Sequence, residues 1–449
     1  MSRARAAIIL AAGQGARMKS ELPKVLHRVG GLAMLGWAIT AAARLGCART
    51  VMVVGAHAPQ VRAHAAKALG EGAVAVQDPP LGTGHAVRAA EAALKGFAGD
   101  VIVLYADTPL LRPETLEALL AGRAGKALAV LGFEAADPTG YGRLVLGAGG
   151  AVERIVEHKD ATEAERAIGL CNSGVLCADA AILFQLLARV GNNNAKGEYY
   201  LTDVVGLARA DGISTHVVRG EQSEFIGVNS RAELAGAEAA FQARARAAAM
   251  DSGVTLIDPA SVFFAHDTAI AADVVIEPNV FFGPGVRIAK GARIKAFSHI
   301  EGAEIGEDAQ IGPFARLRPG AKLGAGVKIG NFVEVKNSSF GPKAQASHLA
   351  YIGDAEVGAR ANLGAGTITC NYDGFEKHKT VIGEDAFIGS NTALVAPVKV
   401  GARAYVGSGS VITKEAPDGA LAVARAKQRD IPGWADAFRA KQQKPRGDK

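Results

Sequence analysis

A six-residue rhythm of apolar side chains runs through the C-terminal half of this 449-residue chain. From Ile270 to Ile412 nearly every sixth residue is aliphatic or aromatic, with a slip of one residue after Ile300 and interruptions after Val335 and Thr369. An amphipathic α-helix would repeat near 3.6 residues, so the pattern excludes it. A fixed period of six is typical of a parallel β-helix of hexapeptide repeats, in which each short strand places one apolar side chain in a shared interior. The sequence therefore predicts such a β-helix here.

The N-terminal half shows a different pattern, in which apolar stretches alternate with helical ones. The strand candidates cover residues 6–10, 50–55, 73–77, 101–105 and 127–133. This alternation predicts an α/β domain of Rossmann-like type, with a mainly parallel sheet covered by helices on both faces. We expect its ligands to bind beyond the carboxyl ends of the strands.

The chain is expected to divide into three parts. Residues 1–229 form the α/β domain. Residues 230–250 are alanine-rich, strongly charged and free of proline, which predicts a helix that links the domains. Residues 251–449 form the β-helix domain and a C-terminal tail.

Charge and cysteine usage narrow the class of protein. The formal net charge is +6, and much of the excess lies in the terminal segment 438–449, which favours a solvated tail or a contact with an anionic ligand over a nucleic-acid-binding face. No apolar run approaches the roughly 20 residues that cross a bilayer, so membrane insertion is not expected. The four cysteines lack the spacing of a zinc site and are expected to be reduced, which favours a cytoplasmic protein.

The first strand candidate ends in a glycine-rich loop. Gly13 and Gly15 are followed by Arg17 and, after a spacer, by Lys24. Glycines after a strand let backbone N–H groups approach phosphate oxygens, and the two cations add positive charge. Met18 stands where the dinucleotide-binding pattern GxGxxG needs its third glycine, and the P-loop pattern is absent too. An ordinary strand-to-helix turn is the alternative, but the added cations favour a phosphate site.

A second loop closes the strand candidate 101–105. Tyr105, Ala106 and Asp107 stand at its carboxyl end. A carboxylate beside a triphosphate is well placed to hold Mg²⁺, which prefers carboxylate and phosphate oxygens. Alone, Asp107 would more often be a turn or helix-capping residue. The presence of the glycine-rich loop in the same chain favours a role for Asp107 as a metal ligand.

These two loops resemble those of sugar-nucleotide pyrophosphorylases, and further motifs extend the resemblance to the uridylyltransferases among them. The motifs are Gln77 and residues 81–86, 140–143, 155–160, 172–174, 198–203 and 227–229. The resemblance implies that the nucleotide and sugar are bound by Leu10, Ala11, Ala12, Gly13, Arg17, Lys24, Gln77, Gly82, Thr83, Tyr105, Ala106, Asp107, Gly142, Glu157, Asn172 and Asn229.

Within that set the resemblance implies distinct tasks. Uracil recognition would use Gln77, Gly82 and Thr83. The sugar would be held by Gly142, Glu157 and Asn172, and the metal by Asp107 and Asn229. Relatives often carry glycine in place of Ala106, so we expect its methyl group to tighten the nucleotide pocket without loss of activity.

The β-helix half can be structural, regulatory or catalytic, and the interruptions of its rhythm favour catalysis. The first, between Val335 and Ile352, contains His348, and the second spans residues 369–379. A surface histidine is the ordinary alternative, whereas an acyltransferase needs a general base at such a place. The segment resembles the pattern K-x-x-H-L-x-Y-x-G-D and departs from it at Gln345, where the pattern has lysine.

With this segment the resemblance covers nearly the whole chain. It is to the bifunctional N-acetylglucosamine-1-phosphate uridylyltransferases and glucosamine-1-phosphate N-acetyltransferases, whose second domain is a left-handed parallel β-helix. The resemblance implies that His348 is the general base and that Glu334 lies near enough to orient or tune it. The sugar phosphate would be bound by Arg318, Lys336, Tyr351 and Asn362, of which the first two supply the cations that a phosphate requires. The acetyl-CoA groove would be lined by Ala365, Asn371, Tyr372, Ser390, Ser408 and Arg425.

The resemblance implies two reactions that supply a precursor of peptidoglycan and lipopolysaccharide. Acetyl-CoA would acetylate glucosamine 1-phosphate, and UTP with Mg²⁺ would then convert the product to UDP-N-acetylglucosamine and pyrophosphate, in a homotrimer. Two alternatives stay open, a pyrophosphorylase with a merely regulatory β-helix and a non-catalytic scaffold. An acyl-enzyme on Cys370 is a rival mechanism, and the sequence leaves the base of the nucleotide undecided.

Overall fold

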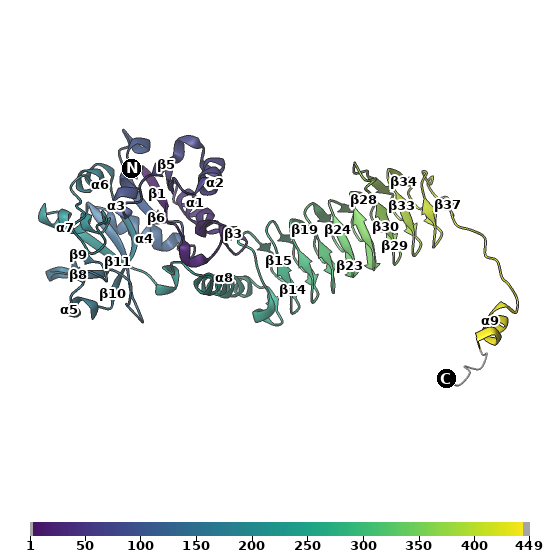
Figure 1. The fold of residues 1–449 in the computed structure, drawn as a ribbon. Helices are drawn as coiled ribbons and strands as arrows, with labels where there is room; N and C mark the ends of the chain where they lie inside the picture. Colours follow the sequence, from purple (N-terminus) through teal and green to yellow (C-terminus); the bar gives the residue numbers. More distant parts are fainter. Residues whose placement is uncertain (1–2, 443–449) are drawn as a thin grey trace, which may run out of the picture. The chain divides into compact units, whose positions relative to one another are not determined.

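The computed structural model describes residues 3–442. Its contacts divide the chain into two compact units, Met1–Ala247 and Ala248–Lys449. Each unit has its own architecture (Figure 1) and is described by itself. No helix among residues 3–442 combines the length and the apolarity that a membrane crossing requires.

Unit 1 is built on a nine-stranded sheet with the order β5-β4-β1-β6-β10-β7-β11-β9-β8. The five strands that the sequence predicts are present within two residues of their expected bounds: β1 Arg5–Ala11, β4 Arg49–Gly55, β5 Val74–Gln77, β6 Asp100–Tyr105 and β7 Leu128–Glu134. The others are β8 Arg143–Leu146, β9 Val152–Val156, β10 Leu170–Asp179 and β11 Thr215–Arg219, and β2 Arg28–Val29 pairs with β3 Leu32–Ala33 outside this sheet.

The expected parallel arrangement holds for one half of this sheet. β5, β4, β1 and β6 are parallel neighbours. In the other half β10 runs antiparallel to both β6 and β7, so that half is mixed. The parallel half gathers the carboxyl ends of its strands at one edge, where ligands of such sheets bind.

Helices cover both faces of the sheet because successive side chains of a strand point to opposite sides. Ala6, Ile8 and Leu10 of β1 face one apolar cluster, and Ala7 and Ile9 face the other. The first cluster is covered by α3 Thr83–Ala89, α6 Ala180–Leu187 and α7 Asp203–Ala210, and the second by α1 Met34–Arg44, α2 Pro59–Leu69 and α4 Pro113–Arg123. A short α5 spans Glu163–Arg166.

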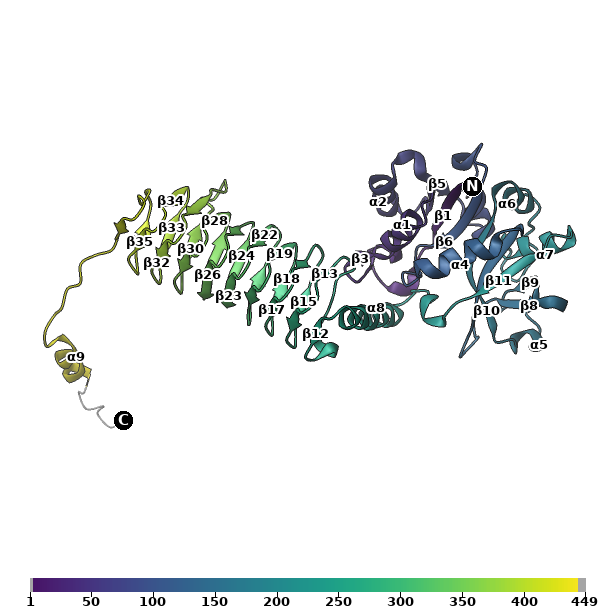
Figure 2. The same ribbon diagram turned by 180° about the vertical axis from the view of Figure 1, so that it is seen from behind.

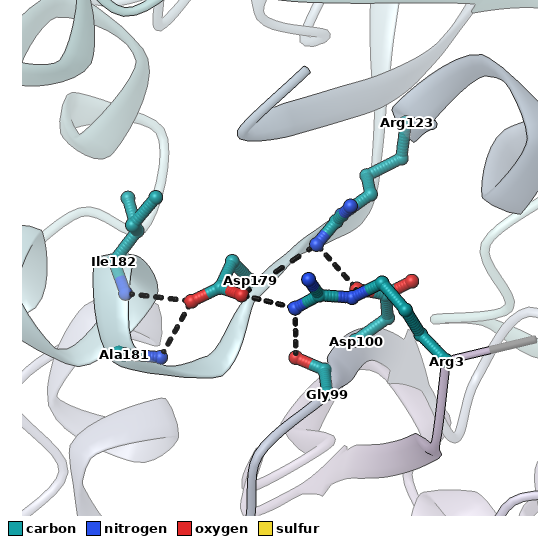
Figure 3. A network of polar contacts seen from close by, with 7 residues as sticks. All are labelled: Arg3, Gly99, Asp100, Arg123, Asp179, Ala181 and Ile182. Atoms are coloured by element: carbon teal, nitrogen blue, oxygen red, sulfur yellow. Dashed lines mark hydrogen bonds and ion pairs between the residues drawn. The ribbon is translucent and has the colours of Figure 1, made fainter. Parts of the chain in front are cut away.

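An ion-pair network lies at the edge of the sheet opposite the carboxyl ends (Figure 3). Asp100, at the start of β6, binds Arg3 over 2.9 Å and also binds Arg123 of α4. Asp179, at the end of β10, pairs with the same two arginines, at 3.6 Å from Arg123. Because Arg123 is buried, the two carboxylates are needed to offset its desolvation. The network ties α4 to the sheet and has a structural role.

The predicted linker helix is α8, Arg231–Asp251. It does more than connect, because the Glu238 carboxylate accepts a hydrogen bond from the Gly30 N–H over 2.8 Å. The ring of Phe241 packs edge-on against Trp37 with 5.5 Å between centroids. An added Cβ on Gly30 would lie 2.5 Å from that Phe241 ring, so a glycine is required for this approach. The first part of α8 thus packs into unit 1, and the boundary between the units in the sequence falls after Ala247, within α8.

Unit 2 is the predicted β-helix, in which three parallel sheets form the sides of successive coils (Figures 1 and 2). Sheet I contains β12 Thr255–Leu256, β14 Val275–Ile276, β17 Arg293–Ile294, β20 Gln310–Ile311, β23 Lys328–Asn331, β26 Gln345–His348, β29 Asn362–Leu363, β32 Phe387–Ile388, β35 Tyr405–Val406 and β37 Leu421–Ala422. Sheet II contains β15 Phe281–Phe282, β18 His299–Ile300, β21 Arg316–Leu317, β24 Glu334–Lys336, β27 Tyr351–Gly353, β30 Ile368–Cys370, β33 Ala393–Val395 and β36 Val411–Ile412. Sheet III contains β13 Ala269–Ile270, β16 Arg287–Ile288, β19 Ala303–Ile305, β22 Ala321–Leu323, β25 Ser339–Phe340, β28 Ala355–Val357, β31 Thr380–Ile382 and β34 Val398–Val400.

The apolar rhythm of the sequence forms the interior of this β-helix. Ile276, Ile294 and Ile311 are fully buried, and each lies beside its counterpart on the next coil. The one-residue slip after Ile300 shortens one coil, so Ile288 pairs with Ile305 across 17 residues instead of 18. The prediction of a hexapeptide β-helix is confirmed.

One of the two predicted interruptions is wrong. Between Val335 and Ile352 the coil continues through β25 and β26, with Phe340 and Ala346 buried at the interior positions. A spacing of five residues and the small Ala346 side chain hide the repeat in the sequence. His348 therefore lies at the end of a regular strand.

The second interruption is confirmed, because residues 371–379 leave the coil between β30 and β31. A helix, α9 Trp434–Gln442, follows the last coil. The remainder of the basic tail, residues 443–449, lies outside the described residues.

Candidate active sites

The two predicted metal ligands of unit 1 are brought together by a lysine. The Lys24 ammonium donates to the Asp107 carboxylate over 2.5 Å and to the side-chain oxygen of Asn229 over 2.9 Å. Asp107 follows β6 at its carboxyl end, and Lys24 is only 9% exposed. The positive charge of Lys24 thus lies between a carboxylate and an amide oxygen.

The glycine-rich loop lies directly after β1, whose last residues include Leu10 and Ala11. Ala12 is buried, and Gly13 is exposed with open space around it. Gly15 has a φ of +67°, and an added Cβ would lie 2.6 Å from the Lys24 Cβ, so the loop needs glycine to bring Lys24 to Asp107. Arg17 is exposed beside this loop.

The expected uracil-binding residues also converge. Gln77 is buried at the end of β5 and donates to the Gly82 carbonyl over 2.9 Å. Gly82 has a φ of +109° and precedes α3, which begins at Thr83. The Thr83 hydroxyl accepts from the Leu201 N–H over 3.0 Å, which fixes this turn against residues 198–203.

The three expected sugar-binding residues form a group of their own. The Asn172 N–H donates to the Gly142 carbonyl over 2.8 Å, and an added Cβ on Gly142 would lie 3.5 Å from the Glu157 carboxylate. Burial raises the pKa of Glu157, although a hydrogen bond from the Thr202 hydroxyl over 3.3 Å opposes that rise. Thr202 belongs to the 198–203 motif, but no role was expected for its side chain.

Tyr105 connects the metal and sugar groups. Burial raises the pKa of its phenol, and the nearby carboxylates of Glu157 and Asp107 raise it further. Its ring lies against Gly174, whose added Cβ would be 2.8 Å away. Ala106 is buried in the apolar core, so its methyl group packs there, and the expected tightening of the nucleotide pocket does not follow from this position.

In unit 2 the two expected phosphate-binding cations lie on neighbouring rungs of sheet II. The register pairs Arg316 with Glu334 and Leu317 with Val335, which places Arg318 beside Lys336. Parallel neighbouring strands are about 4.8 Å apart, so the two cations can bind one anion. Tyr351 lies on the next rung, opposite Glu334.

Glu334 has a partner other than the expected one. Its carboxylate accepts from the Arg318 guanidinium over 2.9 Å. The contact expected between Glu334 and the imidazole is made by Asn331, whose side-chain oxygen lies 2.6 Å from His348 Nδ1. His348 is exposed at the end of β26, and Asn331 is half-buried at the end of β23.

The residues expected to line the acetyl-CoA groove continue the His348 column. In sheet I Gln345 pairs with Asn362, and Asn362 pairs with Phe387. Three residues further along these strands, the same register places Ala365 beside His348 and Ser390 beside Ala365. The same register places Ser408 on the rung after that, and Arg425 donates to its carbonyl over 2.8 Å. Asn371 and Tyr372 begin the loop that leaves the coil, where Asn371 binds the carboxylate of Asp354.

A further cation, which the sequence analysis missed, lies in the same loop. Lys377 is close enough to Lys336 that this neighbouring ammonium lowers the pKa of Lys377. The two ammonium groups repel each other, and the nearby Asp354 carboxylate offsets part of that repulsion. The sequence does not predict this position of Lys377, because its loop lies outside the six-residue repeat.

These features define the class of protein, a nucleotidyltransferase domain joined to a hexapeptide-repeat transferase domain. Residues 7–170 match the model of the MobA-like NTP transferase domain. Residues 302–337 and 379–414 match the model of the bacterial transferase hexapeptide repeats.

Curated relatives match along the whole chain. A bifunctional protein GlmU of Maricaulis maris is 64% identical over 99% of this chain and 98% of its own length. GlmU proteins of Rhizorhabdus wittichii and Caulobacter vibrioides are 60% and 58% identical, over 97% and 98% of this chain and 96% and 95% of their own lengths. The chain belongs to the family of bifunctional GlmU proteins, and it is an enzyme with a nucleotidyltransferase and an acetyltransferase domain.

Proposed function

We propose that the chain makes UDP-N-acetylglucosamine in two steps at two separate sites. Unit 2 acetylates glucosamine 1-phosphate with acetyl-CoA, and unit 1 transfers a uridylyl group from UTP to the product. The observation that carries this proposal is the convergence of Lys24, Asp107 and Asn229 in one unit. In the other unit Arg318 and Lys336 lie on neighbouring rungs of sheet II, and His348 ends a strand of sheet I.

The residues of unit 1 fit Mg²⁺. Carboxylate and amide oxygens suit this ion, and Asp107 and Asn229 already present both kinds to the Lys24 ammonium. No group of three or more acidic, histidine or cysteine side chains in residues 3–442 is placed to hold a metal, so phosphate oxygens and water would complete the coordination. When bound, the ion would offset the charge on the phosphates. Lys24 would then transfer its contacts to a phosphate.

The uridylyl transfer needs no base from the protein. The phosphate of N-acetylglucosamine 1-phosphate is already an anion, and its oxygen attacks the α-phosphorus of UTP while pyrophosphate leaves. Gln77 and Gly82 would orient the uracil, and Glu157 and Asn172 would orient the sugar. Arg17 and Lys24 would stabilise the charge on the departing pyrophosphate.

The acetyl transfer uses a base on the coil. His348 takes a proton from the 2-ammonium group of glucosamine 1-phosphate, and the resulting neutral amine attacks the thioester carbonyl. The C–S bond then breaks, and the second proton that the nitrogen loses converts the departing CoA thiolate to the thiol. The Ala365 N–H or the Ser390 hydroxyl would stabilise the oxyanion. Arg318 and Lys336 would hold the phosphate of the sugar, and Tyr351 and Asn362 its remaining polar groups.

An exposed aromatic ladder on unit 2 supports association between copies of the chain, and the family resemblance implies three copies. Phe297, Phe314 and Phe332 stack on successive coils, with 4.9 and 5.2 Å between ring centroids. They are 53%, 45% and 55% exposed, and Leu349 extends the row at 61%. Apolar rows of this kind mark interfaces. Because Phe332 and Leu349 directly follow Asn331 and His348, a neighbouring copy seated here would complete the acetyl-transfer site.

The trimer can be tested on the ladder itself. Phe314→Asn and Phe332→Asn remove apolar surface but keep residues that tolerate the positive φ found at both positions. Light scattering should then show loss of the trimer, with loss of acetylation and intact uridylyl transfer. A trimeric variant with normal acetylation would contradict this part of the proposal.

We also propose that the enzyme works in the cytoplasm and supplies a precursor of cell-wall polysaccharide. Its four cysteines are free, as expected for a reducing compartment. The proposed activity is tested by incubating the protein with acetyl-CoA, glucosamine 1-phosphate, UTP and Mg²⁺ while CoA thiol and pyrophosphate are followed separately. Replacing UTP with TTP, CTP or ATP tests the preference for uracil.

A further inference from the structure

His348 is held by one side chain, that of Asn331 on the preceding coil. Its Nδ1 lies 2.6 Å from the Asn331 side-chain oxygen. The two residues are direct partners in the register of β23 and β26. An amide oxygen accepts hydrogen bonds and cannot donate them, so the imidazole carries its proton on Nδ1 and leaves the Nε2 lone pair free.

The backbone reinforces this pair. The Leu349 N–H donates to the Asn331 carbonyl over 3.0 Å, so the chain after His348 is tied to the chain after Asn331. The glycine before Asn331 allows a close approach, because an added Cβ on Gly330 would lie 1.9 Å from the Ser347 carbonyl oxygen. Both strands are also four residues long where β17 and β20 have two. The strands of sheet I are therefore longer on the two rungs that carry Asn331 and His348.

The fold of the coil does not require an asparagine at this position. On the two preceding coils the same register places Pro313 and Ala296 there, and neither side chain can accept a hydrogen bond. On the following coil the position is held by Ala365. Asn331 is therefore the one side-chain acceptor among these neighbours of His348.

We propose that Asn331 is a positioning residue for acetyl transfer, which fixes the tautomer and the orientation of the His348 imidazole so that Nε2 faces the substrate amine. This inference rests on the proposed role of His348 as the base. Asn331 acts through His348 and does not need to touch the substrate. The glutamate expected to orient the base, Glu334, is held by Arg318 instead.

The first test is a double-mutant cycle. Asn331→Ala should lower kcat/KM of acetylation by about 10- to 100-fold, since misplaced catalytic groups lose up to about a hundredfold. The same change made in the His348→Ala variant should have an effect below about twofold, because the group that it positions is gone. Uridylyl transfer should be unchanged in all variants.

The second test is the pH profile, which a merely structural role would not move. In Asn331→Asp a carboxylate replaces the amide next to Nδ1 and stabilises the imidazolium, so the His348 pKa rises and a higher pH is needed to keep the base neutral. The acid limb of kcat/KM should move up by about one pH unit or more. Lys328 on β23 and the Arg318–Glu334 pair on sheet II are present in every variant, so the shift is assigned to the new carboxylate.

Asn279→Ala is the matched control, because Asn279 lies at a corner of an earlier coil, next to Pro278, and its φ is +60°. It should lose stability without loss of acetylation. The inference is overturned if Asn331→Ala acetylates within twofold of wild type, if it costs the same factor with and without His348, or if Asn331→Asp leaves the acid limb in place. A normal rate in His348→Ala would instead overturn the proposed base.

Discussion

The two sites of this molecule are assembled in opposite ways. In unit 1 the Lys24 ammonium meets Asp107 and Asn229, which are 83 and 205 residues away in the sequence. In unit 2 the closest polar pairs, Asn331 with His348 and Arg318 with Glu334, are 17 and 16 residues apart. The first site depends on the whole sheet, whereas the second depends on the period of the coil.

This difference affects what completes each site. Lys24 is 9% exposed and Asp107 is 21% exposed, so the metal group lies within its own unit. Arg318 is 34% exposed, and the row of Phe314, Phe332 and Leu349 beside His348 is exposed to solvent. A coil is too thin to enclose a substrate, so a site on its surface needs a second chain to exclude water. The sheet site should therefore survive alone, and the coil site should not.

Separating the units tests this comparison most strongly. A fragment that ends at Met250 should be folded, transfer uridylyl groups to N-acetylglucosamine 1-phosphate and lack acetylation altogether. A fragment that ends at residue 229 should be much less stable, because it lacks the contacts of Glu238 and Phe241 with Gly30 and Trp37. Circular dichroism melting and pyrophosphate release measure both outcomes. Acetylation by the longer fragment would contradict the assignment.

Asp107→Ala should abolish uridylyl transfer and spare acetylation. The change removes a metal ligand and the partner of Lys24, and the loss of several kcal/mol of charge stabilisation corresponds to a rate fall of roughly a thousandfold or more. Asp211→Ala is the control, because that carboxylate pairs with Arg189 on the surface of the same unit. A fall below tenfold in Asp107→Ala would mean that the metal is held elsewhere.

His348→Ala should lower acetylation by roughly a hundredfold to ten-thousandfold, the usual contribution of general base catalysis, and leave uridylyl transfer unchanged. His299→Ala serves as the control, because this imidazole stacks on Phe281 with 4.9 Å between ring centroids, on a different side of the coil. Near-normal acetylation in His348→Ala together with an inactive Cys370→Ala would replace the general base by an acyl-enzyme.

The smallest expected effect is on stability. Burial raises the pKa of Glu157, so the folded state holds its proton more tightly than the unfolded state does. Deprotonation therefore destabilises the fold progressively as the pH rises from the unfolded pKa to the folded one. Glu157→Gln removes that penalty and should raise the Tm at pH 7 by up to about 4 °C, the effect of about 1 kcal/mol in a domain of this size.

The advantage of Glu157→Gln should disappear below the pKa of an unfolded glutamate, about 4.3. The variant should also have a higher KM for the sugar phosphate, since an amide oxygen is a weaker hydrogen-bond acceptor than a carboxylate. A Tm gain that is equal at pH 4 and pH 7 would show that burial of the charge is not the cause.

The period of six alone predicts the fold of unit 2, because each coil places equivalent apolar side chains in the same interior. It fails where a small residue such as Ala346 occupies an interior position and where the spacing shortens before Phe340. In unit 1 the five strands are predicted by apolar runs, but β8 to β11 are not, and the antiparallel place of β10 depends on partners distant in sequence.

Among the site residues, those carried by a motif are predicted and those defined by a neighbour are not. Lys24, Asp107 and His348 stand in motifs whose chemistry is visible in the sequence. Asn331 and Lys377 can be recognised as site residues only in the structure, where the coil brings Asn331 beside His348 and the loop brings Lys377 beside Lys336. Such contacts follow from the register of the coils, which no local pattern expresses.

A mixing experiment tests the central claim, that two independent sites act in sequence on a freely diffusing intermediate. Asp107→Ala and His348→Ala proteins are incubated separately and together with glucosamine 1-phosphate, acetyl-CoA, UTP and Mg²⁺. Asp107→Ala alone should release CoA without pyrophosphate, and His348→Ala alone should release little of either. The mixture should restore UDP-N-acetylglucosamine formation and release both products. A mixture as inactive as its components would contradict the account.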